Sequence, residues 1–310
     1  MSCIFGPVPS RRLGRSLGID LAPFKTCCYD CVYCQLGRTP RRAIERRQWL
    51  PAADILRELE PRLSSAPDYI TLGGSGEPTL YAGLDDLIAG IKSLTDIPVA
   101  VITNGALLWR ADVRGELLPA DLVAPSLDAG DAATFQRINR PAPEIDFERM
   151  AQGLVDFRRD YHRQYWLEIF LVQGLNDGPE SLAAIQNWAA RIAPDRVQLN
   201  TVARPPADAG ILPAPPGRLQ EIARRFRPPA EVIADYRQTA APVARPAAAA
   251  EILAMLQRHP GTAADVAAGL GIALAVAVRQ LEKMRQAGQV RTRECEGRRF
   301  YMAPGGNGYA

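Results

Sequence analysis

The chain has 310 residues, of which 47% are hydrophobic and 23% are charged. This composition excludes a largely disordered chain, and the length predicts about two domains. The net charge is +3, but residues 1–50 hold nine basic and three acidic residues. That segment is either a basic patch for an anionic ligand or nucleic acid, or a solvated surface. No apolar run approaches the roughly 18 residues of a membrane span, so we expect a cytoplasmic protein.

The first predicted strand, residues 16–21, leads into a cluster of cysteines. Four of the six cysteines lie within eight residues: Cys27, Cys28, Cys31 and Cys34. A disulfide framework would spread its cysteines along a small secreted chain, whereas clustering in a large chain indicates a metal site. Zinc sites pair two short Cys/His clusters, and no second cluster exists here. Three thiolates with one open position therefore favour an iron–sulfur cluster.

A glycine-rich turn follows the second predicted strand, residues 69–73. The sequence there reads Gly73-Gly74-Ser75-Gly76-Glu77-Pro78. Glycines at the end of a strand let the backbone approach a ligand closely, although a plain strand-to-helix turn has the same composition.

Strand and helix patterns then alternate, which predicts parallel strands joined by right-handed crossovers. Further strands are expected at 98–103, 122–127, 165–172 and 196–201, and helices at 52–63, 84–94, 145–160 and 179–192. In such folds ligand residues lie where the strands end. The polar candidates at these ends are Asn104, Ser126, Asp128 and Asn200. Asn, Ser and Asp are also routine helix caps, so a structural role is the alternative.

A second, smaller domain is expected after a linker rich in Ala and Pro, residues 239–250. Helix patterns at 251–257, 262–270 and 273–287 precede a hairpin pattern at 290–294 and 298–303. This order looks like a winged helix-turn-helix. The start of its third helix is small and apolar, which disfavours sequence-specific reading of DNA. Non-specific nucleic-acid binding, peptide docking and domain packing stay open.

Together the motifs resemble the radical SAM superfamily. The spacing Cys27-x3-Cys31-x2-Cys34 is that of the superfamily, and an aromatic residue, Tyr33, precedes the third cysteine. The segment Gly74-Ser75-Gly76-Glu77-Pro78 is a variant of its Gly-Gly-Glu-Pro motif. The spacing Cys28-x2-Cys31-x2-Cys34 remains a rival ligand set.

The resemblance implies an α/β fold, a partial (β/α)6 barrel at 1–238, followed by the linker, the winged-helix-like domain at 251–303 and a tail at 304–310. It also implies a 4Fe-4S cluster on Cys27, Cys31 and Cys34, with S-adenosylmethionine (SAM) bound to the open iron through its amino and carboxylate groups. The implied SAM contacts are Tyr33, Gly74, Gly76, Glu77, Asn104, Ser126, Asp128 and Asn200.

The implied reaction is reductive cleavage of SAM to methionine and a 5′-deoxyadenosyl radical, which abstracts hydrogen from a substrate. A reducing protein would donate the electron. Residues 4–208 are similar to a bacterial and archaeal branch grouped with the wyosine-tRNA synthases. Those enzymes carry a second cluster on further cysteines, and Cys3, Cys28 and Cys295 form no such group. The substrate stays open, and the basic segment indicates an anionic one such as RNA, a nucleotide or a phosphorylated metabolite.

Two other function classes fit part of the sequence. An iron–sulfur sensor joined to a winged helix would explain the cysteines and the C-terminal domain. It would not explain Gly76-Glu77-Pro78 or the six strand–helix units. A zinc-binding module would explain the cysteines alone. The sequence therefore predicts a radical SAM enzyme.

Overall fold

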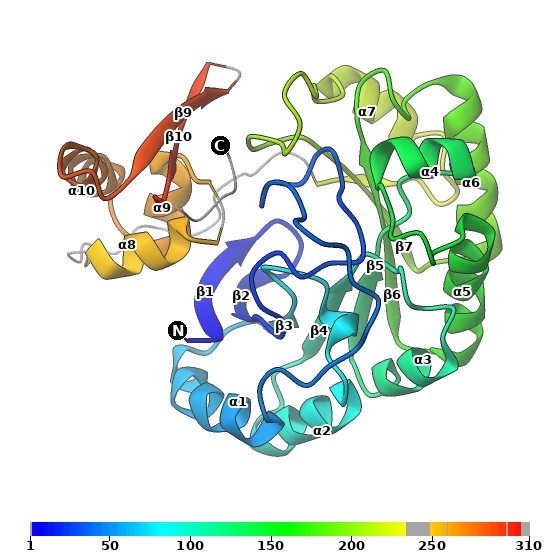
Figure 1. Cartoon of the computed structure of the whole chain (residues 1–310), viewed down its shortest axis with the longest axis horizontal. Helices are drawn as coiled ribbons and strands as arrows, with labels where there is room; N and C mark the ends of the chain where they lie inside the picture. Colours follow the sequence, from blue (N-terminus) through cyan, green and yellow to red (C-terminus); the bar gives the residue numbers. More distant parts are fainter. Residues whose placement is uncertain (1, 234–248, 259, 296, 305–310) are drawn as a thin grey trace.

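The computed structural model describes residues 2–233, 249–258, 260–295 and 297–304. Its largest feature is an eight-stranded sheet in which the strands are ordered as they are in sequence, from β1 to β8 (Figure 1). β1 and β2 form an antiparallel hairpin, and every later pair of neighbours is parallel. The strands are β1 Ile4–Ser10, β2 Gly14–Ile19, β3 Tyr69–Leu72, β4 Val99–Thr103, β5 Leu122–Pro125, β6 Gln164–Leu171, β7 Arg196–Thr201 and β8 Glu231–Val232.

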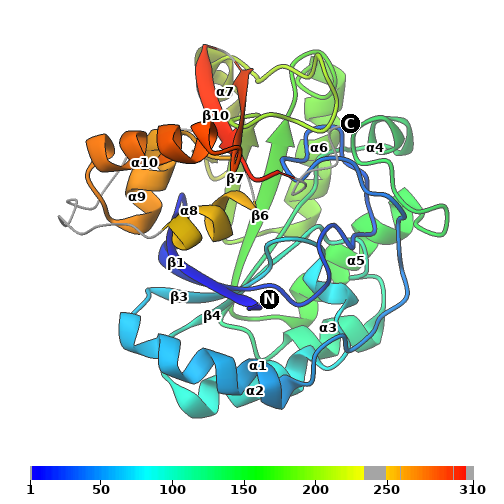
Figure 2. The ribbon, with the colours of Figure 1, turned by 60° about the vertical axis from the view of Figure 1, so that its left-hand side comes forward.

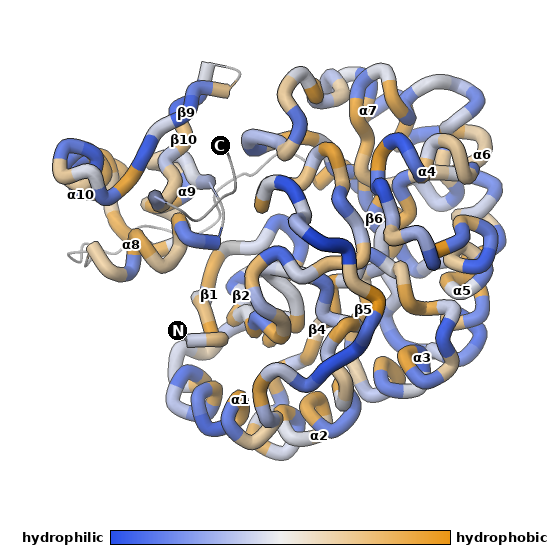
Figure 3. The backbone as a smooth tube through the Cα atoms, in the orientation of Figure 1, coloured by the Kyte–Doolittle hydropathy of each residue, from blue (hydrophilic) through white to orange (hydrophobic). Residues whose placement is uncertain are grey.

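Helices connect the parallel strands and surround them on the outside (Figure 1). They are α1 Ala52–Leu59, α2 Leu84–Leu94, α3 Ala111–Leu117, α4 Ala132–Ile138, α5 Phe147–Asp160, α6 Pro179–Ile192 and α7 Pro216–Ala223, with short 3-10 turns η1 Glu60–Ser65 and η2 Pro78–Leu80. Each longer helix is amphipathic. α2, for example, buries Leu84, Leu87, Ile88 and Ile91 at helical spacing and leaves Asp85 and Asp86 outside. Figure 3 shows this alternation of hydrophobic and hydrophilic residues along the helices.

All six predicted parallel strands are present, within a few residues of their expected bounds. The sequence missed β1 because Gly6, Pro7 and Pro9 are poor strand residues, and such a segment is tolerated at a sheet edge. It also missed the short helices α3, α4 and α7. The observed architecture is the expected α/β one, with a mostly parallel sheet.

The C-terminal residues form three helices and a hairpin beside β1 (Figures 1 and 2). These are α8 Ala249–Leu256, α9 Ala263–Leu270, α10 Leu274–Gln286, β9 Arg291–Cys295 and β10 Arg298–Met302. They bury a hydrophobic cluster of their own, which includes Ile252, Leu281 and Tyr301. Of the predicted linker, residues 239–248 lie outside the described residues, as do 305–310 of the predicted tail.

None of the described helices is long and apolar enough to cross a membrane alone. α9 and α10 pass that test of length and composition only as a pair bent by 117°.

Candidate functional site

A cavity of about 470 Å³ is lined by residues of the sheet and of the loops around it. This volume is within the size range of cofactor and small-ligand sites. Its lining comes from β1 to β4, β6 and β7, from the cysteine loop that follows β2, and from the loops after the strands. Met255, Arg258 and Asp265 of the C-terminal unit also line it. Segments from both ends of the chain therefore meet at one cavity.

The cysteine loop places two of its thiols, Cys27 and Cys34, on the cavity wall. Cys31 is half-buried and does not line the cavity. Cys28 does not line the cavity and is completely buried in the main hydrophobic cluster. In the part of the chain that the structure describes, no three side chains of His, Cys, Asp or Glu converge as ligands of a single metal ion.

The thiols of Cys27, Cys31 and Cys34 each accept one hydrogen bond from a side-chain N–H group. Lys25 Nζ lies 2.9 Å from Cys34 Sγ. The amide Nδ2 of Asn104 lies 3.4 Å from Cys27 Sγ. The amide of Asn139 lies 3.5 Å from Cys31 Sγ. Donors of this kind stabilise negative charge on sulfur and orient the groups that ligate a metal.

Burial makes two of these thiols, those of Cys27 and Cys31, hard to ionise by themselves. It raises the pKa of Cys27 to about 11, although the Lys25 ammonium lowers it. The pKa of Cys31 is raised well above the ordinary value, again mainly by burial. Burial would lower the pKa of Lys25, but the nearby sulfurs of Cys34 and Cys27 outweigh it and the pKa is raised. A thiophilic cation that displaced the protons would relieve this cost.

The glycine-rich turn is held against the cysteine loop by backbone hydrogen bonds. Lys25 N donates to Ser75 O at 2.6 Å, and Glu77 N donates to Thr26 O at 2.9 Å. A Cβ on Gly76 would lie 2.4 Å from Thr26 O, so a larger residue would separate the two segments. Gly74 has a φ of +157°, and its missing Cβ leaves room for the Asp20 carboxylate. That carboxylate accepts a bond from Ser75 N at 2.7 Å.

The Glu77 carboxylate accepts four hydrogen bonds from the protein, three at Oε1 and one at Oε2. Oε1 accepts bonds from Thr79 N at 3.0 Å, Thr79 Oγ1 at 2.6 Å and Thr103 Oγ1 at 2.5 Å. Oε2 accepts a bond from Asn104 N at 2.8 Å. Burial nevertheless raises the pKa of Glu77, against the lowering effect of these donors. The side chain thus joins the ends of β3 and β4 and fixes Asn104 beside Cys27.

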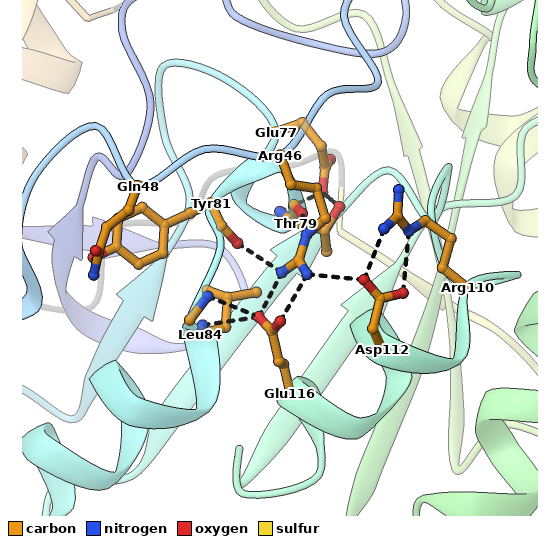
Figure 4. A network of polar contacts seen from close by, with 10 residues as sticks. Arg46, Gln48, Glu77, Thr79, Tyr81, Leu84, Arg110, Asp112 and Glu116 are labelled. Carbon is orange, nitrogen blue, oxygen red and sulfur yellow. Dashed lines mark hydrogen bonds and ion pairs between the residues drawn. The ribbon is translucent and has the colours of Figure 1, made fainter.

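A buried guanidinium supports the same turn from outside, as Figure 4 shows. Arg46 Nε donates to Thr79 O at 2.9 Å, and Nη2 donates to Tyr81 O at 2.8 Å. Its Nη1 donates to Glu116 Oε1 at 2.7 Å. The same Glu116 carboxylate accepts bonds from Leu84 N and Gly83 N at the start of α2. Arg46 therefore links the segment after the cysteines to the turn that carries Glu77.

The aromatic residue between the cysteines, Tyr33, stands on the cavity wall. Its ring stacks on Phe170 with 3.8 Å between centroids, and its hydroxyl donates to Asp128. Asp128 also accepts bonds from Asn139 Nδ2 at 2.7 Å and from Phe170 N at 2.9 Å. Burial raises the pKa of Asp128 to about 6, although the three donors lower it.

The structure brings most of the predicted site residues together. Seven of the eight predicted SAM contacts line the cavity: Tyr33, Gly74, Gly76, Glu77, Asn104, Ser126 and Asn200. Asp128 does not line it, but lies behind Tyr33 and orients that ring.

Comparison with known proteins identifies the family. The sequence matches the radical SAM superfamily over residues 21–184, which include the cysteine loop and the glycine-rich turn. The chain belongs to the radical SAM superfamily. Members of this superfamily are enzymes, typically with a 4Fe-4S cluster and SAM, so the chain is a radical SAM enzyme.

Curated relatives share the same segment. A UPF0026 protein of Methanocaldococcus jannaschii is 39% identical over 217 residues, which cover 69% of this chain and 67% of that protein. A UPF0026 protein of Synechocystis is 40% identical over 203 residues, 65% of this chain and 76% of that protein. A protein named GTPase Obg in Brachyspira hyodysenteriae is 51% identical over 203 residues. That match spans 65% of this chain but 30% of the Brachyspira protein.

Solved structures show the same fold at low sequence identity. TYW1 with a lysine–pyruvate adduct bound superposes with a TM-score of 0.54 at 18% identity, over 73% of this chain and 76% of that chain. A radical SAM methyltransferase from Sphaerobacter thermophilus has a TM-score of 0.53 at 14% identity, over 72% and 67%.

Sequence reasoning missed several residues of this radical SAM site. Lys25 and Asn139 contact the thiols of Cys34 and Cys31. Arg11 contacts Asn200. None of these three was assigned to the site from the sequence. One signal was available for Lys25, because the chain has 34 arginines and three lysines. A lysine two residues before the cysteines is unusual in that composition.

Proposed function

We propose that Cys27, Cys31 and Cys34 ligate a 4Fe-4S cluster and that the cavity beside them binds SAM. When bound, the reduced cluster supplies the electron that cleaves SAM to methionine and a 5′-deoxyadenosyl radical, which takes a hydrogen atom from the substrate. The observation that carries this proposal is the set of three thiols, each with one side-chain N–H donor, of which Cys27 and Cys34 line the cavity.

The donor set fits the cluster. Thiolates are the ligands that iron–sulfur clusters take, and hydrogen bonds to the sulfurs are a usual part of such sites. The position of Cys28 in the hydrophobic core favours Cys27 over Cys28 as the first ligand. The Lys25 ammonium adds a positive charge beside Cys34, which offsets part of the negative charge that three thiolates bring.

The other residues of the site would bind and orient SAM. Gly74 and Gly76 line the cavity, and their missing side chains let this turn pack against Asp20 and Thr26. Glu77 would hold Asn104 and the turn in place through the four hydrogen bonds that its carboxylate accepts. Asp128 would act in the same indirect way, by fixing the Tyr33 ring against Phe170.

The C-terminal unit, which we take to be a winged-helix-like domain, would close the cavity. Arg258 makes an ion pair with Asp20 at 3.1 Å, and its guanidinium lies 4.6 Å from the centroid of the Phe5 ring. Met255 and Asp265 complete that wall. A closed wall excludes water and quenching groups from a reactive site. An external reducing protein would supply the electrons.

The test uses protein reconstituted with iron and sulfide without oxygen. Dithionite and SAM are added, and 5′-deoxyadenosine is quantified. The wild type is expected to produce it, Cys31→Ala is not, and Cys28→Ala serves as the control that keeps activity. A loaded, reducible cluster without SAM binding would contradict the proposal. Tight binding to DNA in the same sample would then favour an iron–sulfur sensing regulator.

A further inference from the structure

The C-terminal unit contacts the rest of the chain next to the glycine-rich turn. Among the described residues, its buried hydrophobic cluster is separate from the clusters of the main sheet and its helices. The two parts are therefore joined by contacts outside either core, with α9 against β1 (Figures 1 and 2). Domains joined in this way commonly move relative to each other, so the contacts that fix their docking also shape the cavity they share.

Arg258, which follows α8, is held in one position at this contact. Its Nη1 donates to Ala254 O of its own helix at 2.9 Å, and its Nη2 donates to Ser2 O at 3.3 Å. Its Nε donates to Asp20 Oδ2 at 3.1 Å. A guanidinium is planar with N–H groups in fixed directions, so three acceptors leave it little freedom. The Arg258 and Asp20 side chains are 18% and 14% exposed, so water screens this ion pair less than a surface pair.

Asp20 follows β2 and extends this contact to the glycine-rich turn. Its other oxygen, Oδ1, accepts the bond from Ser75 N at 2.7 Å. The missing Cβ of Gly74 leaves the space that this oxygen occupies. One carboxylate thus binds Arg258 with one oxygen and the backbone of the turn with the other. A shift of the first contact therefore changes the second.

A second contact between Arg258 and the turn runs through Phe5 of β1. The Arg258 guanidinium lies 4.6 Å from the centroid of the Phe5 ring, within the range of a cation–π contact. Two atoms of the same ring lie 3.1 Å from the place that a Cβ on Gly74 would occupy. The ring therefore lies against both the guanidinium and Gly74. Arg258 acts on the turn by two routes, a carboxylate and an aromatic ring.

We propose that Arg258 is a positioning residue for the glycine-rich turn, and that docking of the C-terminal unit and binding of SAM stabilise each other through it. The inference rests on the proposed function, which places SAM beside that turn. Gly74, Gly76, Met255 and Arg258 all line the cavity. If docking favours the conformation of the turn that binds SAM, SAM favours docking by the same factor, because binding linkage is reciprocal. The C-terminal unit therefore closes the cavity most tightly when SAM is in place.

The first measurement uses the reconstituted full chain without SAM. Hydrogen–deuterium exchange is followed by mass spectrometry in peptides that span Ser75, whose amide reports the bond to Asp20. Arg258→Met removes the charge and the donors, and exchange at Ser75 should become about fivefold faster, as for loss of a partly buried ion pair. The matched control is Arg285→Met on α10 of the same unit, where Arg285 pairs with Glu282 at the surface. It should exchange like the wild type, and α9 should keep its protection in both variants.

The second measurement is the affinity for SAM, by equilibrium dialysis without reductant. Arg258→Met and Asp20→Asn should each bind SAM about fivefold more weakly than the wild type. The asparagine keeps an oxygen for Ser75 N but loses the charge that faces Arg258. The double variant should bind no more weakly than either single variant, because both substitutions break the same link. Arg285→Met should bind like the wild type.

The inference is overturned if exchange at Ser75 is unchanged in Arg258→Met, or if that variant binds SAM within about twofold of the wild type. It is also overturned if the losses multiply in the double variant, since the two residues would then act independently. Loss of protection in α9 of Arg258→Met would assign the arginine to the stability of its own unit and overturn the inference too. If the wild type binds no SAM, the proposed function fails, and exchange at Ser75 still decides whether Arg258 positions the turn.

Discussion

The substitution Glu77→Gln tests whether this carboxylate holds the site together from within. Glutamine has the same shape but replaces one oxygen by an NH2 group. In its better orientation the remaining oxygen takes the place of Oε1 and keeps the bonds from Thr79 and Thr103. The NH2 group then takes the place of Oε2, which lies 2.8 Å from Asn104 N in the wild type. Two hydrogen-bond donors would then face each other at this position.

The expected cost follows from these contacts. A buried donor left unpaired costs about 1–3 kcal/mol, and the three remaining bonds weaken because the acceptor is no longer charged. Removing a buried charge offsets part of this, since burial raises the pKa of Glu77. We expect a net loss of about 2 kcal/mol in the free energy of unfolding. Asn104 should also move away from Cys27, so SAM cleavage should fall as well.

Urea unfolding followed by circular dichroism gives the stability, and 5′-deoxyadenosine formation gives the activity. Glu144→Gln, at an exposed position of a loop, is the matched control and should change neither. A loss below about 0.5 kcal/mol, the range of surface substitutions, with full activity would refute the view that Glu77 joins β3 to β4.

Three further predictions concern the thiols and Asp128. Cys31→Ala should lose bound iron and the cluster absorbance after reconstitution, while Cys28→Ala keeps both; equal loss in the two variants would contradict the proposed ligand set. Lys25→Met removes a positive charge beside Cys34 and should lower the cluster's midpoint potential by on the order of 50–100 mV in an EPR redox titration. Lys92→Met, whose ammonium pairs with Asp121 on the outside, should leave it unchanged. Burial raises the pKa of Asp128 from 3.8 to about 6, so the folded protein holds this proton more tightly than the unfolded chain. As the pH rises from 3.8 to about 6, the wild type should therefore lose up to about 3 kcal/mol of unfolding free energy relative to Asp128→Asn. If the unfolding free energies of the two proteins change in parallel with pH, the shift in the pKa of Asp128 is excluded.

Local sequence determined the secondary structure and the kind of chemistry. The six parallel strands and the longer helices were predictable because their apolar residues recur at the spacing of a strand or helix. The prediction that Cys27, Cys31 and Cys34 bind a cluster came from local spacing, because one loop contains all three. The polar residues at strand ends were predictable as neighbours because the ends of parallel strands meet at one edge.

Only the tertiary structure shows which side chains contact those residues. Asn139 reaches Cys31 from 108 positions away, and Arg11 reaches Asn200 across 189, so neither pair leaves a trace in local spacing. Asp128 follows β5, and its carboxylate contacts Tyr33 on the side where Asn139 and Phe170 also offer it donors. The direction of a buried polar side chain is set by the donors around it, and these come from distant parts of the chain.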